Sequence, residues 1–253
     1  MPTVTLAVVQ ARMGSTRLPG KVLADLGGRP VLQLMLERLR RAHLDHLVVA
    51  TSDGAGDDPV AALAESMGLP VVRGSETDVL GRFLLAVDRF PADDVVRLTA
   101  DCPLIDPVVV DSAIGLHRRT GADYTSNTLE RTFPDGLDVE VVRAVALRQA
   151  AADAVDPGER EHVTPFLQHH PERFTFASLE TVEQLAHERW TLDTPEDLDR
   201  LRAIVAKLDD PVGAGWHEVL AVAGVLDGPP RRMPAPPELR FVNHTFDRQP
   251  AHR

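Results

Sequence analysis

The chain of 253 residues has little of several residue types, and each scarcity excludes a class of protein. Its single cysteine, Cys102, excludes an intramolecular disulfide and an all-cysteine zinc site. Aromatic residues make up only 4% of the chain, which disfavours a stacking surface for single-stranded nucleic acid. No stretch reaches the roughly 18 apolar residues of a membrane-spanning helix, and the first twenty residues lack a signal-peptide pattern. We therefore expect a soluble, cytoplasmic protein with no membrane partner.

Positive charge is also scarce, because 27 Lys and Arg residues face 38 Asp and Glu residues, a formal net charge of −11. Proteins that bind DNA or RNA gain affinity by neutralising phosphates, so this acidity disfavours a nucleic-acid partner. To bind a small polyanion, such an acidic protein would need a local cluster of basic residues that overcomes the negative potential of the whole chain. The acidic surplus does suit a protein that holds divalent cations.

Strand-like and helix-like segments alternate through the first hundred residues. Short β-branched runs predict strands at 3–9, 47–51, 71–73 and 95–99, and apolar periodicity predicts helices near 32–41, 58–67 and 77–90. This order predicts an α/β fold with a doubly wound, mostly parallel sheet and right-handed crossovers. Ligands of such sheets bind outside the carboxyl ends of the strands.

The second half of the chain is more mixed. Its patterns predict helices at 106–120, 143–152 and 159–170, and strands at 124–127, 137–142, 174–179 and 189–192. Thr194 and Pro195 predict the start of a further helix, with Thr194 as N-cap. Residues 228–237 contain five prolines and indicate a linker. The last sixteen residues are predicted to be an arm on a partner subunit or a frayed end.

The strongest chemical signal is the segment ARMGSTRLPGK at residues 11–21, directly after the first predicted strand. It combines three cations (Arg12, Arg17 and Lys21) with two hydroxyls and two glycines. A triphosphate needs all three types, because cations offset its charge while hydroxyls and glycine-rich backbone supply N–H and O–H donors. Val22 follows the lysine, so the segment is not a Walker A loop. A solvated basic loop is the alternative for such a cluster alone.

Two aspartates follow later elements. Asp101 ends the fourth predicted strand in LTADCPL, where it could hold magnesium bound to substrate phosphates or cap the turn before Pro103. Asp193, in RWTLDTPED, could converge with Asp101 as a second ligand or simply favour the following helix through its dipole. Sequence separation does not decide their proximity. No base is visibly paired with Cys102, so a structural role is expected for it.

These three motifs together resemble the cytidylyltransferases that make CMP-activated sugars. The similarity is greatest to the spore-coat polysaccharide branch, and more distant to CMP-3-deoxy-manno-octulosonate and CMP-acylneuraminate synthetases. Further matching motifs lie at residues 72–80, 124–129, 133–140 and 159–165, and the resemblance covers about residues 3–247. It implies a nucleotide-diphospho-sugar transferase fold of GT-A-like, Rossmann type, with CTP as substrate and Mg²⁺ as cofactor.

The resemblance also assigns site residues. The nucleotide is expected at Ala11, Arg12, Met13, Gly14, Ser15, Thr16, Arg17, Lys21, Arg73, Gly74, Ala100 and Asp101. The metal is expected at Asp101 and Asp193, and these two with Arg12 and Lys21 form the expected catalytic set. The acceptor is expected at Asn127, Asp135, Gly136, Asp138, Glu140, Arg160 and His162. His162 is either a surface residue or a catalytic one.

The implied organisation is one nucleotidyltransferase domain at 1–227, with an acceptor and dimerisation insertion at about 123–180. A linker and tail follow at 228–253, and the partners are CTP, a small anionic acceptor and a second subunit. Three alternatives stay open: another base, a phosphonate or phosphate acceptor, and a catalytically idle nucleotide-binding subunit. The presence of both aspartates and all three loop cations argues against the idle subunit.

Overall fold

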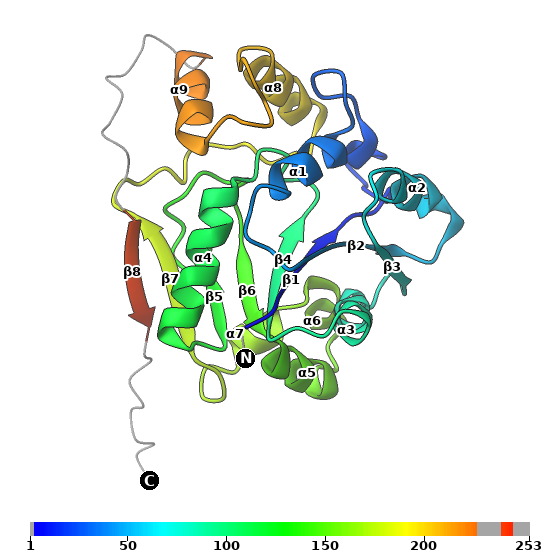
Figure 1. The fold of residues 1–253 in the computed structure, drawn as a ribbon, viewed down its shortest axis with the longest axis vertical. Coiled ribbons are helices and arrows are strands. Elements are labelled where there is room, and N and C mark those ends of the chain that lie inside the picture. The colour runs from blue at the N-terminus through cyan, green and yellow to red at the C-terminus, as the bar shows by residue number, and fades with distance from the viewer. Residues whose placement is uncertain (1–2, 227–238, 245–253) are drawn as a thin grey trace.

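One sheet organises the chain, as seen in a computed structural model that describes residues 3–226 and 239–244 (Figure 1). Its strand order is β3-β2-β1-β4-β6-β5-β7-β8. The strands are β1 (Thr5–Gln10), β2 (His46–Ser52), β3 (Val71–Gly74), β4 (Asp94–Thr99), β5 (Tyr124–Ser126), β6 (Glu140–Arg143), β7 (Phe176–Thr181) and β8 (Leu239–His244). The helices are α1 (Val31–Leu39), α2 (Asp58–Ser66), α3 (Val79–Arg89), α4 (Pro107–Thr120), α5 (Ala144–Asp153), α6 (Pro157–His162), α7 (Pro165–His169), α8 (Pro195–Val205) and α9 (Trp216–Leu226), and two 3-10 turns are η1 (Lys21–Leu23) and η2 (Ala55–Asp57).

The first four strands are parallel, and β1 lies between β2 and β4. β6 runs antiparallel to both of its neighbours, β4 and β5, while β7 runs parallel to β5. The predicted doubly wound, mostly parallel α/β sheet is thus confirmed. The chain winds from β1 towards β3 and then returns to add β4 on the other side of β1. The loops after β1 and β4 therefore diverge at a topological switch point, where such sheets bind ligands.

Two apolar cores cover the two faces of the sheet. Successive strand residues point to opposite faces, so Ala7 and Val9 enter one core while Leu6 and Val8 enter the other. The first core packs against α1, α2, α4, α8 and α9, and the second against α3, α5 and α7. Helices α3 and α5 lie side by side (Figure 1). Burial on both faces explains why β1 is a continuous apolar run rather than an alternating one.

The single helix predicted at residues 159–170 is wrong, because the structure has α6 and α7 instead. They are separated at Val163, whose φ is 74°. Pro165 follows two residues later, and it has no N–H for residue 161 while its ring would clash with that carbonyl in a continuous helix. Helix α6 therefore ends at His162, and α7 begins as a separate helix at Pro165.

The strand predicted at residues 189–192 is also wrong. Arg189 makes only an isolated bridge to Asp135, and the Leu192 N–H donates to the Asp101 carbonyl at 2.8 Å. The segment is therefore held by two loops rather than by a strand. The strand predicted at 137–142 begins only at Glu140.

Near the carboxyl end, residues 239–244 of the predicted tail form β8, which pairs antiparallel with β7 of the same chain. For these six residues the expected partner arm or frayed end is thus replaced by a strand of the chain's own sheet. The proline-rich segment and the final nine residues lie outside the described residues. Across the described part of the chain, no helix has the length and apolar character that a membrane crossing requires.

Candidate active site

A cavity of about 670 Å³ lies at the carboxyl ends of β1 and β4. Its wall brings together eleven of the predicted site residues: Ala11, Arg12, Gly14, Ser15, Thr16, Arg17, Lys21, Ala100, Asp101, His162 and Asp193. Gln10, Val22, Glu76 and Thr99 complete it. Five parts of the chain (residues 10–22, 76, 99–101, 162 and 193) thus meet around one space at the switch point, where the topology places a ligand.

The Lys21 ammonium joins the two predicted metal aspartates. Its Nζ donates to Asp101 Oδ2 at 3.1 Å, to Asp193 Oδ1 at 3.0 Å and to the Leu192 carbonyl at 2.7 Å. Only 12% of the Lys21 side chain is exposed, so water screens these contacts weakly. Asp101 and Asp193 therefore converge on a single cation, which their sequence positions could not establish.

The loop after β1 is held in place at both of its ends. Gly20 adopts φ 73°, which lets the chain double back so that its N–H donates to the Met13 carbonyl at 3.0 Å. At the other end, Asp57 of η2 accepts the Met13 N–H at 2.6 Å and the Ser52 hydroxyl. Burial raises the pKa of Asp57, but the hydrogen bonds from Met13 and Ser52 outweigh it and leave the pKa below its usual value.

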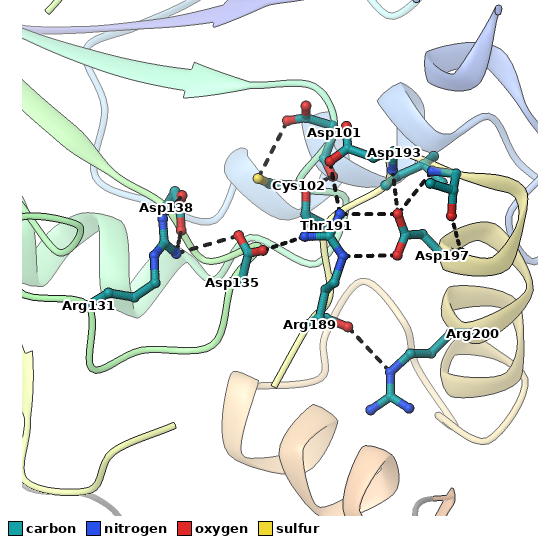
Figure 2. Close-up of polar contacts among 12 residues, drawn as sticks. Asp101, Cys102, Arg131, Asp135, Asp138, Arg189, Thr191, Asp193, Asp197 and Arg200 are labelled. Carbon is teal, nitrogen blue, oxygen red and sulfur yellow. Dashed lines mark hydrogen bonds and ion pairs between the residues drawn. The ribbon is translucent and has the colours of Figure 1, made fainter. Parts of the chain in front are cut away.

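Asp193 is oriented by two residues that the sequence did not single out for the site, Arg189 and Asp197 (Figure 2). Arg189 Nη2 donates to Asp193 Oδ2 at 2.9 Å, and Asp197 Oδ2 accepts the Asp193 N–H at 2.8 Å. Asp197 also completes a capping box with Thr194, which confirms the predicted start of α8. Burial raises the pKa of Asp193, but Lys21, Arg189 and the nearby Arg17 hold it below its usual value. Asp193 is therefore an ionised carboxylate at neutral pH.

Arg189 also connects Asp193 to two predicted acceptor residues outside the cavity wall (Figure 2). Arg189 Nη1 lies 2.7 Å from Asp135 Oδ2, and Arg131 binds both oxygens of Asp138 at 2.8 Å. Burial and the neighbouring charge of Asp138 raise the pKa of Asp135. The alternating charges form a continuous chain from the cavity to the 131–138 loop.

Gly136 sits in that loop where only glycine fits. Its φ is 115°, and a Cβ there would lie 2.6 Å from the carbonyl carbon of Trp190. Backbone contact at this point keeps the 131–138 loop against the segment that carries Asp193.

Three other predicted acceptor residues lie away from the cavity wall and make internal contacts. Glu140 is buried, accepts from Tyr124 and pairs with Arg97. The Asn127 side chain bonds the backbone of residues 137 and 139. Arg160 donates to Asp78 at 2.8 Å and so connects α6 with α3. Each of these side chains thus holds the frame around the site.

Three predicted nucleotide residues are also absent from the cavity wall. Arg73 donates to the carbonyls of Ser52 and Gly54, both at 2.9 Å, and pairs with Asp58. Gly74 packs against the Arg82 stem, which a Cβ would approach to 3.0 Å. Met13 contributes its backbone to loop anchoring. The structure therefore brings together the predicted nucleotide residues of the 11–21 loop other than Met13, but not Arg73 and Gly74.

The donors around Lys21 fit a hard divalent cation. Two carboxylates and the Leu192 carbonyl already surround a positive charge, and Mg²⁺ typically takes one or two protein carboxylates plus phosphate and water oxygens. Among the described residues, no group of three or more His, Cys, Asp or Glu side chains is arranged to hold a metal.

Burial and then the charge of Asp101 raise the pKa of the Cys102 thiol well above its usual value, so the thiol stays protonated.

The chain is similar in sequence and in fold to known proteins. The model of a family described as cytidylyltransferase matches residues 6–213. The chain is 38% identical to the spore coat polysaccharide biosynthesis protein SpsF of Bacillus subtilis, over 86% of this chain and 92% of that protein. It is 32% identical to a 3-deoxy-manno-octulosonate cytidylyltransferase of Rhodospirillum centenum, over 81% and 83%. A solved cytidylyltransferase structure from Leptospira borgpetersenii superimposes with a TM-score of 0.85 at 31% identity, covering 89% of this chain and 96% of that one.

Proposed function

The chain belongs to the cytidylyltransferase family and is therefore a nucleotidyltransferase, and on that premise we propose that it transfers CMP from CTP to a small anionic sugar and releases pyrophosphate. The observation that carries the proposal is the meeting of Lys21, Asp101 and Asp193 beside a loop rich in cations and hydroxyls. A triphosphate and its counter-charges fit that combination.

In the proposed reaction, an acceptor oxygen attacks the α-phosphorus of CTP in line, a new P–O bond forms and the bond to pyrophosphate breaks. The protein has little covalent work to do, so its contribution is positioning and charge stabilisation. Lys21, Arg12 and Arg17 surround the cavity and would stabilise the charge that builds on pyrophosphate. Ser15 and Thr16 offer hydroxyl donors on the same wall.

We propose Mg²⁺ as cofactor, with Asp101 and Asp193 as its protein ligands. When bound, the ion would supply Lewis-acid polarisation of the phosphoryl oxygens. The support is the all-oxygen donor set that already holds the Lys21 ammonium. Arg189 keeps one oxygen of Asp193 occupied, so the other faces the cation.

The acceptor is proposed to be a sugar with an anionic group. A relative named for 3-deoxy-manno-octulosonate and another named for a spore coat polysaccharide support a sugar. Arg189 connects Asp193 to Asp135, and Arg131 connects Asp135 to Asp138. The two carboxylates suit sugar hydroxyls, and Arg131 suits an anion. The homodimer and the domain bounds stay predictions. Light scattering of the purified chain checks the dimer.

A pyrophosphate-release assay tests the function. The purified chain is mixed with Mg²⁺, one of the four nucleoside triphosphates and a panel of acceptors that includes sugar acids, sugar phosphates and phosphonates. We expect release to require CTP and a sugar acid. Release with another nucleotide would show that the substrate is not CTP. Release with only a phosphonate would show that the acceptor is not a sugar acid. No release with any pair would favour a catalytically idle nucleotide-binding subunit.

A further inference from the structure

The turn between α6 and α7 is strained at one residue. Val163 has φ 74° and ψ −54°, and it is the one non-glycine residue with positive φ in the described ranges. The Thr164 N–H donates to the His162 carbonyl at 2.9 Å, which closes a γ-turn around Val163. This turn is rare and strained, and a β-branched side chain makes it more so. Strain of this kind persists only where the surroundings impose it, and it concentrates at functional sites.

Buried contacts hold the turn in that conformation. Val163 itself is fully buried, and Thr164 Oγ1 donates to Glu140 Oε1 at 2.6 Å. Glu140 also pairs with Arg97, whose Nε donates to Gln10 Oε1 at 3.1 Å. Gln10 lies in the wall of the cavity. The network thus connects the strained turn to β1 at the base of the site.

The residue just before the strained position is His162, which belongs to the same cavity wall. Its side chain is exposed, and no hydrogen bond or ion pair is recorded for it among the described residues. Glu161 lies 3.6 Å from Arg12 of the phosphate loop, so the end of α6 is also attached to the nucleotide side. The backbone and its anchors therefore present a free imidazole to the space where the reaction is proposed to occur.

We propose that His162 is the general base of the reaction and that the Val163 turn positions it. This inference rests on the proposed function and takes the acceptor's nucleophile to be a hydroxyl. The hydroxyl proton passes to the imidazole as the oxygen bonds to the α-phosphorus, and the electron pair of the broken P–O bond leaves with pyrophosphate. The imidazolium then releases its proton to water.

The other groups around the cavity suit this task less well. The charged groups around His162 belong to three sets. Some line the same cavity wall (Arg12, Arg17, Lys21, Glu76, Asp101 and Asp193), some lie on its own helix (Glu159, Arg160 and Glu161), and two pair with that helix, His169 from α7 and Asp78 from the N-cap of α3. The two aspartates of the cavity wall are already in ion pairs: Asp101 pairs with Lys21, and Asp193 pairs with Lys21 and two arginines. His162 is the one histidine among the residues of the cavity wall, and histidine is the side chain that most often serves as a general base.

The first test compares His162→Gln with His169→Gln, an exposed histidine on α7 that pairs with Glu159 and lies outside the cavity wall. Pyrophosphate release is followed from pH 5.5 to 8.5 with the hydroxyl acceptor that is fastest in the panel. We expect His162→Gln to lower kcat by about 10²-fold or more, to lose the acidic limb of the kcat/KM profile, and to bind CTP as wild type does in calorimetry. His169→Gln should match wild type throughout.

The second test separates catalysis from folding. Exogenous imidazole should restore part of the activity of His162→Ala, because a small base can enter the open cavity. Thr164→Val keeps the shape but removes the anchor to Glu140, so kcat should fall while the acidic limb stays. A His162→Gln enzyme with wild-type kcat and pH profile would overturn the inference alone, as would an acceptor that reacts only through a phosphate oxygen. A wild-type chain that releases no pyrophosphate would instead overturn the proposed function and this inference with it.

Discussion

The Nζ atom of Lys21 lies 3.0 Å from Oδ1 of Asp193, although 172 positions separate the two residues. The contact joins the 11–21 loop to the segment before α8. Asp101, at the end of β4, accepts from the same Lys21 Nζ. The cation between the two carboxylates offsets their mutual repulsion, so the two aspartates can lie close together. The same contact makes the loop sensitive to any change in either partner.

Replacing Lys21 should weaken the stabilisation of the transition state. We expect Lys21→Ala to lower kcat/KM for CTP by about 10²–10³-fold, since a fixed donor to developing charge is removed. The matched control is Lys207→Ala, because the chain has only two lysines and Lys207 is exposed after α8. Steady-state kinetics of pyrophosphate release measure both, and equal kcat/KM values for the two variants would remove Lys21 from the site.

Replacing Asp101 should remove the dependence on divalent cation. Asp101→Asn keeps the side-chain shape but loses the charge that a metal needs, so pyrophosphate release should fall to background at every Mg²⁺ concentration. Asp209→Asn, at an exposed position after α8, is the control. A Mg²⁺ titration with circular dichroism of each variant separates metal loss from unfolding. An unaltered Mg²⁺ response in Asp101→Asn would contradict the metal assignment.

Arg189 should act through Asp193 rather than on the substrate. Arg189→Gln releases Asp193 Oδ2 and breaks the connection to Asp135, so the apparent Mg²⁺ affinity and kcat should fall by about 10- to 100-fold. CTP affinity without metal should change little. Arg202→Gln on the exposed side of α8 is the control. If both variants keep wild-type Mg²⁺ affinity, Arg189 only supports the capping box with Asp197.

Asp57 should make the stability of the loop depend on pH. Its pKa is lower in the folded chain than in the unfolded one, so its contribution is complete above about pH 4 and is lost as the pH falls through the folded pKa. We expect Asp57→Asn to lower the free energy of unfolding by about 1–3 kcal/mol at pH 7, because it weakens the hydrogen bonds to Met13 and Ser52. The difference from wild type should shrink at pH 3.

Denaturant titrations at pH 7 and pH 3 check this result, with the exposed neighbour Asp53→Asn as control. A difference between wild type and Asp57→Asn that is the same at both pH values would show that the Asp57 charge contributes nothing.

Local sequence patterns were enough to predict the sheet and the residues that lie at its carboxyl edge. Alternating strand and helix patterns specify a parallel sheet, because parallel strands need crossover helices. A basic, glycine-containing loop after β1 and an aspartate at the tip of β4 then have to lie at the carboxyl edge. The helix start at Thr194 was also predictable, since capping depends on residues within four positions.

Which distant side chains meet depends on the folded arrangement of the whole chain. Local patterns carry no information on whether Asp193 reaches Asp101, and the contact depends on how the segment before α8 crosses the sheet edge. For the same reason, local patterns did not reveal that Arg189 connects Asp193 to Asp135, which lies 54 positions from Arg189. Nor did they reveal that Arg73 contacts the end of β2 rather than the cavity. Long-range packing also placed Glu140 in a buried network, because its partners Tyr124, Arg97 and Thr164 converge only in the folded chain.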